Sequence, residues 1–191
     1  MTVDSTSVVI DNDFLQKTFE MRQERKTIVS VLQEIFHMLG LNPVVHPLVF
    51  ENEMKTNRII ADDVFENGII KVPSWEDIHQ NDDNQKQYYS FLICELYKKM
   101  FGEPLETGEK DVFSFWRATH SLGEIHSVSM CLLRDCKFFL SDDQDSKDLC
   151  SMIKNCFMKD IFVYNRSEIR EKLRANGTAL SRKELRSFTH Q

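Results

Sequence analysis

Two short apolar runs in this chain each end abruptly in acidic residues. Val8-Val9-Ile10 is followed by Asp11-Asn12-Asp13, and the run 137–141 is followed by Asp142, Asp143 and Asp145. Such short apolar runs are typical of strands buried on both faces. Ligands bind outside the carboxyl ends of the strands in an open parallel sheet, so we expect these acids to meet at one edge. Crowded carboxylates repel each other unless a cation lies between them, so the sequence predicts a metal site and metal-assisted phosphodiester chemistry.

Two further acids could join this edge. Glu53 lies on a helix predicted after His46-Pro47, and Glu124 follows Gly123 in the first turn of another. Each acid also has an ordinary explanation. Asp11 or Asp13 could cap a helix, Glu124 could interact with a helix dipole, and Glu53 could be a surface charge. The same holds for the acids after the second run, which could form an acidic turn with a helix cap.

Other residue types offer fewer options. His46 and His126 are each either a ligand or proton carrier, or a structural histidine. Ser127 and Ser141 have no paired base in view, and the chain contains no Gly-rich phosphate loop or dinucleotide fingerprint. The five cysteines form no Cys-x-x-Cys pair, which favours free thiols in a reducing cytosol.

The elements that must position the acids alternate between strands and helices. This alternation predicts an α/β fold, a three-layer α/β/α sandwich with a mostly parallel central sheet. Scarce Gly and Pro, at 6 and 4, argue against a loop-rich all-β fold. The apolar spacing predicts helices over 14–39, 48–55, 87–101, 121–133 and 145–156, strands over 8–10, 43–45, 69–73, 137–141 and 161–164, a short helix over 112–118, loops over 77–87 and 102–110, and a helix-prone tail over 167–190 that breaks at Asn176-Gly177.

The charge is divided unevenly along the chain. The net charge is −6, yet the segment from Lys159 to the end holds eight Lys and Arg against four Asp and Glu, a balance of +4. This argues against broad, non-specific coating of a duplex but does not exclude a nucleic-acid substrate. No stretch is long enough to span a membrane, and no basic region precedes an apolar core near Met1, so we expect a cytoplasmic protein without membrane association.

The order of the acids resembles that of PIN-domain nucleases. Val9-Ile10-Asp11 resembles their opening strand, and the segment 47–54 looks like their second acidic helix, with Glu53 matching better than Glu51. Leu122-Gly123-Glu124 resembles a Gly-Glu motif that opens the family's late helix, and 138–143 is similar to a strand that ends in Asp-Asp. The resemblance covers roughly residues 8–165, and the part from Gly123 to Asp143 is the most specific.

The resemblance implies a fold, a cofactor and a reaction. It implies a three-layer fold that binds Mg²⁺ or Mn²⁺ and cuts single-stranded or structured RNA, with residues 1–165 as the PIN-like domain and 62–118 as an extended helical insert. His126, the length of that insert and the basic tail over 166–191 depart from the family pattern. The residues implied in catalysis and metal binding are Asp11, Glu53, Glu124 and Asp143, with Asp142 and Asp145 as supporting ligands, and the candidate RNA-binding residues in the tail are Arg170, Lys172 and Arg174.

Three functions fit these observations. The first is a metal-dependent endoribonuclease that hydrolyses RNA phosphodiester bonds with cations held by Asp and Glu. The second is a non-catalytic PIN-like binding or regulatory module, in which the insert and the tail contact a protein partner or a second copy of the chain. A weaker third is a phosphatase or receiver-like domain, for which Lys147 is a poor match because it follows Asp143 by only four residues.

Overall fold

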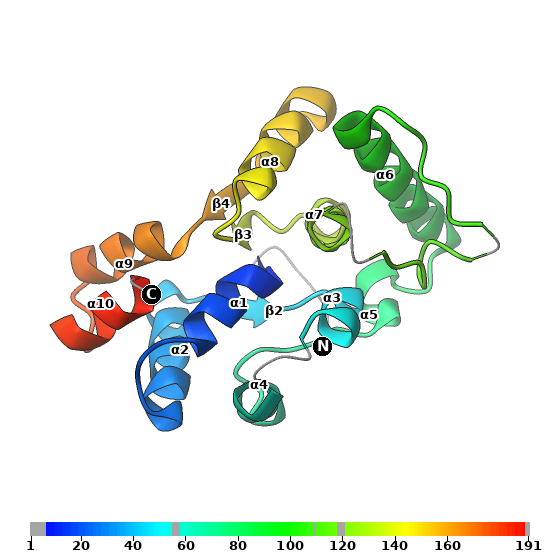
Figure 1. Ribbon diagram of the computed structural model, residues 1–191. Coiled ribbons are helices and arrows are strands. Elements are labelled where there is room, and N and C mark those ends of the chain that lie inside the picture. The colour runs from blue at the N-terminus through cyan, green and yellow to red at the C-terminus, as the bar shows by residue number, and fades with distance from the viewer. Residues whose placement is uncertain (1–6, 55–57, 109, 118–120, 190–191) are drawn as a thin grey trace.

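A computed structural model describes residues 7–54, 58–108, 110–117 and 121–189, and within these it shows an α/β fold (Figure 1). Four parallel strands form one sheet in the order β2-β1-β3-β4. The predicted α/β class and parallel sheet are therefore confirmed. The strands are β1 (Ser7–Ile10), β2 (Asn42–Val44), β3 (Phe138–Leu140) and β4 (Phe162–Tyr164).

Helices cover both faces of the sheet and give it three layers. One face packs against α6, α7 and α8, and the other packs against α1, α2, α9 and α10. No helix in the described part of the chain is long and apolar enough to cross a membrane. The described helices are α1 (Asn12–Phe19), α2 (Arg25–Leu39), α3 (Pro47–Asn52), α4 (Arg58–Glu66), α5 (Trp75–His79), α6 (Asp83–Phe101), α7 (Leu122–Arg134), α8 (Gln144–Phe157), α9 (Arg166–Ala175) and α10 (Arg182–Thr189).

Alternate strand residues enter two separate hydrophobic clusters. Val9 and Phe139 face the cluster under α6 and α7, while Ile10 and Leu140 face the cluster under α1 and α2. Successive strand side chains point to opposite faces, so a strand covered on both sides is apolar throughout. This is why the two apolar runs show no polar alternation.

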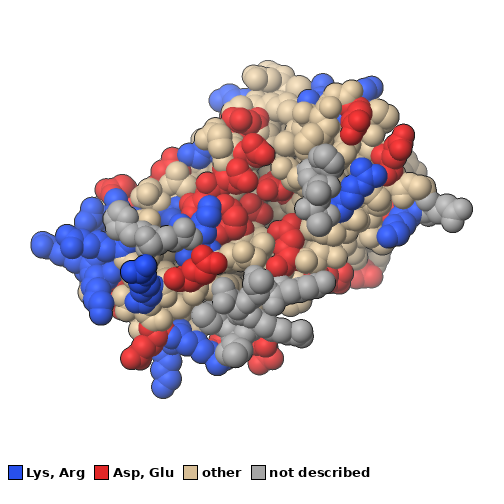
Figure 2. All heavy atoms as spheres, in the orientation of Figure 1, with Lys and Arg blue, Asp and Glu red and all other residues tan. Residues whose placement is uncertain are grey.

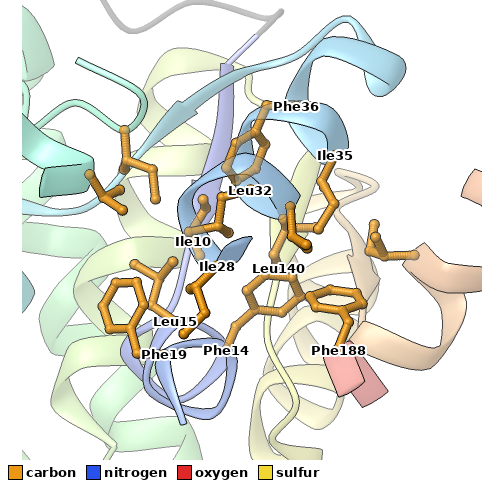
Figure 3. Packing of buried hydrophobic residues seen from close by; sticks show 14 of the residues in the cluster. Ile10, Phe14, Leu15, Phe19, Ile28, Leu32, Ile35, Phe36, Leu140 and Phe188 are labelled. Atoms are coloured by element: carbon orange, nitrogen blue, oxygen red, sulfur yellow. The ribbon is translucent and has the colours of Figure 1, made fainter. Parts of the chain in front are cut away.

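The basic tail packs onto the second of these clusters. Phe188 of α10 meets Phe14 of α1 edge to face, with ring centroids 5.9 Å apart (Figure 3). Ile169, Leu173 and Leu185 are buried in the same cluster. The domain boundary at residue 165 stays a prediction, but α9 and α10 contribute to the same core as α1 and α2.

Several element predictions were wrong. The helix expected over 14–39 is divided, because the chain turns after Phe19 and buries Met21 before α2 begins. The loop expected over 77–87 instead holds the end of α5 and the start of α6. A Ser74–Asp77 capping box starts α5, and Asp82 caps α6, so the acids that indicated a loop are helix-starting residues.

Two other segments differ from expectation. The strand predicted over 69–73 is reduced to one parallel bridge between Val44 and Lys71, and α4 was not expected. The short helix predicted over 112–118 is a turn over 112–114 followed by irregular chain to residue 117, and residue 118 lies outside the described residues. The helix stop at Gly40 is confirmed, with a left-handed φ of 60°. So is the break near Asn176-Gly177, since α9 ends at Ala175.

The strand order shows at which end of the sheet a ligand site is expected. From β1 the chain goes to β2 on one side and then returns to β3 on the other side, so the order reverses between β1 and β3. In open parallel sheets, the crevice outside the carboxyl ends at such a reversal is the usual ligand site. Asp11 follows β1 directly and Ser141 follows β3 directly, so both flank this point.

Candidate functional site

Asp11 and Ser141 lie side by side at the carboxyl edge of the sheet. Strand register pairs Ile10 with Leu140, and the Asp11 amide donates to the Leu140 carbonyl at 2.9 Å. The Ser141 hydroxyl is buried 3.1 Å from Oδ2 of Asp11 and 3.3 Å from Oδ1 of Asp13. The Ser141 hydroxyl is therefore shared between two carboxylates. It connects the end of β3 to the end of β1 through side chains.

The Asp11 carboxylate also caps α1. Its Oδ1 accepts the Asn12 amide at 2.8 Å, and its side chain is nearly fully buried. The cap expected as the ordinary explanation is therefore present, yet one backbone hydrogen bond and one hydroxyl leave a buried carboxylate only partly compensated.

Glu53 lies directly over the first turn of α7. It ends α3, and a Cβ atom on Gly123 would fall 2.5 Å from its Oε1 and 3.3 Å from the Trp116 ring. A larger residue at position 123 would force the Glu53 carboxylate to move from this place. This close approach explains the Gly-Glu pair and places Glu53 next to Glu124, on the end of a helix that favours negative charge.

Asn12 contributes a neutral side chain to this cluster. A hydrogen bond from its side-chain amide stabilises the ionised form of Glu53 and lowers its pKa. Its Oδ1 is buried and has no hydrogen-bond partner among the described residues. An unpaired buried oxygen beside several carboxylates is an available hard donor for a cation.

Burial and mutual repulsion raise the pKa values of three carboxylates in this cluster. Burial, and then the charges of Glu124, Asp13 and Glu53, raise the pKa of Asp11 well above its ordinary value. Burial and the nearby Glu124 raise the pKa of Glu53 to about 7. The pKa of Glu124 is also raised, first by burial and then by Asp143, Asp13 and Asp145. Titratable groups with shifts from burial and from each other are common at functional sites.

The other predicted ligands lie at the border of this cluster. Asp143 caps α8, and its Oδ1 accepts the Asp145 amide at 3.0 Å. Asp145 is exposed, with its Oδ2 3.4 Å from the Ser121 hydroxyl. Both carboxylates interact with Glu124 through their charge. They therefore lie at the outer side of the buried group rather than within it.

Asp142 points away into an ion pair with Arg166. Its carboxylate accepts the Arg166 Nε–H and, at 2.8 Å, the Arg166 backbone amide. The same guanidinium donates to the backbone carbonyls of Lys17 at 3.0 Å and Phe188 at 3.1 Å. Arg166 thus joins β3, α1 and α10 at once, which gives Asp142 a structural explanation.

The donor set suits a hard cation, but the carboxylates are not fully assembled around one point. Within the described residues, no group of three or more His, Cys, Asp or Glu side chains is arranged to hold a metal ion. Oxygen donors from Asp11, Glu53, Glu124 and Asn12 are the type that Mg²⁺ and Mn²⁺ prefer. Binding would require these side chains to close in by rotamer changes on fixed backbone positions.

The acids form one continuous surface next to a basic one. Figure 2 shows a band of Asp and Glu across the centre of this face and a concentration of Lys and Arg beside it, over the region of α9 and α10. A charge boundary of this kind can orient a long anion across the acids. The three tail residues predicted to bind RNA are largely occupied: Arg170 donates to Thr189 at 2.8 Å, Arg174 pairs with Glu171 at 3.6 Å, and Lys172 lies 4.4 Å from the Tyr164 ring centre.

Sequence reasoning missed several contributors. Asn12, which lies between two acids, was not predicted as a site residue, and Ser141 was considered only as a nucleophile. Asp13 was considered only as a helix cap, yet its Oδ1 lies 3.3 Å from the Asp142 amide as well as close to Ser141. The position of Asn12 and Asp13 directly after Asp11 was the one available signal, because a strand end places consecutive residues at the same edge.

The raised pKa of Glu53 predicts how stability depends on pH without metal ions. Between about pH 4.5 and 7 the folded protein keeps a proton on Glu53 that the unfolded chain loses, so this residue destabilises the fold as pH rises. We expect Glu53→Gln to gain about 2 kcal/mol relative to the wild type between pH 4.5 and 7.5, a figure reduced because Glu53 is partly exposed. Urea unfolding in EDTA measures it.

The wild-type pH profile alone cannot show this effect, because two buried histidines change the folding free energy with pH in the opposite direction. Burial lowers the pKa of His46 and of His126, the latter to about 3, so their contribution to stability is lost as pH falls below 6.5. Subtracting the variant's pH profile from the wild-type profile removes that part. Glu51→Gln, an exposed acid two residues away, is the matched control. A flat difference for Glu53→Gln would contradict the prediction.

Comparison of the chain with family models, with characterised proteins and with solved structures gave no match.

Proposed function

We propose that this protein is a PIN-like, metal-dependent ribonuclease whose site is the carboxylate group at the end of β1 and β3. The observation that carries the proposal is the mutual elevation of pKa among Asp11, Glu53 and Glu124 at the reversal of strand order. A site that brings three carboxylates with raised pKa values together in low dielectric loses stability unless positive charge enters it. Binding of Mg²⁺ or Mn²⁺ by the carboxylates would compensate for this loss of stability.

The residues divide into holding and supporting roles. Asp11, Glu53, Glu124 and the free oxygen of Asn12 would hold the ion, and Asp143 would act at its outer side. When bound, the ion supplies a more acidic water and neutralises charge on a phosphodiester. In this proposal water attacks the phosphodiester directly, and the buried Ser141 hydroxyl stays hydrogen-bonded to Asp11.

RNA is the proposed substrate because a polyanion fits the charge boundary beside the acids. Arg182, Lys183 and Arg186 of α10 are exposed. Arg182 and Arg186 have no partner among the described residues, whereas the α9 cations are engaged as described. A bond of 3.2 Å between Gln23 and Ser187 fixes α10 to the loop before α2. We therefore place the phosphate-binding surface on α10 rather than on Arg170, Lys172 and Arg174.

Removing the three exposed cations of α10 should weaken RNA binding. We expect Arg182→Ala/Lys183→Ala/Arg186→Ala to reduce affinity for a labelled single-stranded RNA about 10- to 100-fold in EDTA. The salt dependence should fall by a log–log slope of about 2, from three lost phosphate contacts. Fluorescence anisotropy at several salt concentrations measures both. Lys98→Ala/Lys99→Ala on α6, across the sheet, is the control, and an equal loss there would rule out a specific surface.

One observation favours the alternative of a non-catalytic binding module. The described carboxylates do not form a ready-made three-ligand group, and a scaffold that only binds a partner needs none. Partner binding and catalysis make different predictions for added metal, because the first does not require a divalent ion.

The direct test of the proposed function is cleavage of a mixed single-stranded RNA pool with Mn²⁺ and with EDTA. We expect metal-dependent products from the wild type. If no products form and Mn²⁺ produces no thermal stabilisation, the nuclease proposal fails and the binding-module interpretation replaces it.

A further inference from the structure

Three buried aromatic side chains join α3 to α7 close to the carboxylate site. The Tyr89 hydroxyl of α6 lies 2.9 Å from Nε2 of His46 and 2.6 Å from Nδ1 of His126. All three side chains are fully buried. His46 precedes α3, and His126 lies in the first two turns of α7, so one hydroxyl bridges two helices that also contact each other directly.

The hydrogen bonds of this bridge fix its proton positions. Nδ1 of His46 accepts the Leu48 amide at 3.2 Å, so the His46 proton is on Nε2 and is donated to the Tyr89 oxygen. The Tyr89 proton is then donated to Nδ1 of His126. In this arrangement the His126 proton is on Nε2, which is buried and has no hydrogen-bond partner among the described residues.

Packing of rings holds the hydroxyl in place from both sides. The Tyr89 ring stacks on Phe113 with centroids 5.4 Å apart, and it meets Trp75 edge to face at 5.6 Å. The ring of His46 stacks on that of His126 at 5.2 Å. The hydroxyl could therefore be removed with the ring still packed, which separates its hydrogen bonds from the hydrophobic contribution.

The helices joined by the bridge are those that carry Glu53 and Glu124. Glu53 ends α3 seven residues after His46, and its carboxylate rests over Gly123, three residues before His126. We propose that Tyr89 is a positioning residue whose hydroxyl, by tying α3 to α7, fixes Glu53 against the first turn of α7 beside Glu124. Its effect on metal binding rests on the proposed function, whereas its effect on the placement of Glu53 does not.

Tyr89→Phe tests the proposal with two readouts. We expect the Gly123 amide resonance, which lies beneath the Glu53 carboxylate, to shift or broaden in ¹H–¹⁵N spectra of the metal-free protein. We also expect Mn²⁺ affinity to fall about tenfold, as for other supporting residues of metal sites. Tyr97→Phe removes the same atom from a buried residue about 12 Å further along α6, and it should leave both readouts unchanged.

The outcomes separate this inference from the proposed function. An unchanged Gly123 resonance together with unchanged Mn²⁺ affinity in Tyr89→Phe would overturn the positioning role. If the wild type binds no Mn²⁺, the proposed function fails and the Gly123 resonance alone decides the inference. If Tyr89→Phe does not fold, His46→Asn replaces it, because asparagine retains the helix cap of α3 but is too short to reach Tyr89.

Discussion

Asp11→Asn should reduce metal-dependent RNA cleavage at least about 100-fold while leaving the fold intact, since loss of even an outer partner of a metal ligand costs 10- to 100-fold. The asparagine can keep the local hydrogen bonds. Its oxygen can accept the Asn12 amide, and its NH₂ group can donate to the Ser141 hydroxyl, now 3.1 Å from Oδ2. Initial rates with a labelled RNA in Mn²⁺ measure the loss.

The same substitution should not destabilise the metal-free protein. Burial and three neighbouring carboxylates oppose ionisation of Asp11, so a neutral isostere removes an unfavourable charge. We expect a melting temperature in EDTA at pH 8 equal to or above that of the wild type. Asp148→Asn, an exposed acid on α8, is the control for a lost charge and should keep full activity. Full activity in Asp11→Asn would exclude Asp11 as a ligand.

Arg166→Ala should cost about 3 kcal/mol of folding free energy, because it leaves the Asp142 carboxylate without its partner and two carbonyl groups without donors. Arg166 is only 8% exposed, so water cannot replace these contacts fully. The loss should appear as a lower urea midpoint, and α10 should exchange its amide hydrogens faster than α6 does.

Arg170→Ala is the matched control for the loss of the Arg166–Asp142 ion pair. Arg170 is one turn further along α9 and pairs with the exposed Glu171, so we expect a loss below about 1 kcal/mol. If Arg166→Ala were no more destabilising than Arg170→Ala, the ion pair with Asp142 would have no structural role. Asp142 would then be free to act as the supporting ligand that the sequence first indicated.

Local patterns were sufficient to predict the α/β fold class and the end of the sheet at which the candidate carboxylates gather. Val8-Val9-Ile10 and Phe139-Leu140 are buried, and the two strands are paired in register, so the acids directly after them lie at one edge. The Gly123-Glu124 pair was identified from the sequence as the start of a helix. The structure explains the glycine, because the Glu53 carboxylate lies close to it.

Contacts between distant segments could not be predicted in the same way. The ion pair between Arg166 and Asp142 and the hydrogen bonds of Tyr89 depend on how helices pack against each other. The residue spacing within a single helix or strand predicts neither of them. The acids at Asp77 and Asp82 misled the element assignment, because acidic residues start helices as readily as they form loops. The same ambiguity applied to Asp11, which is both a cap and a member of the carboxylate group.

The most direct test of the carboxylate site is an Mn²⁺ titration of ion-free protein at pH 8, followed by the EPR signal of the free ion. The proposed site predicts that the wild type removes Mn²⁺ from solution and that Glu124→Gln binds it at least about tenfold more weakly. No binding by the wild type at millimolar Mn²⁺, or equal binding by both proteins, would contradict a metal site at these residues.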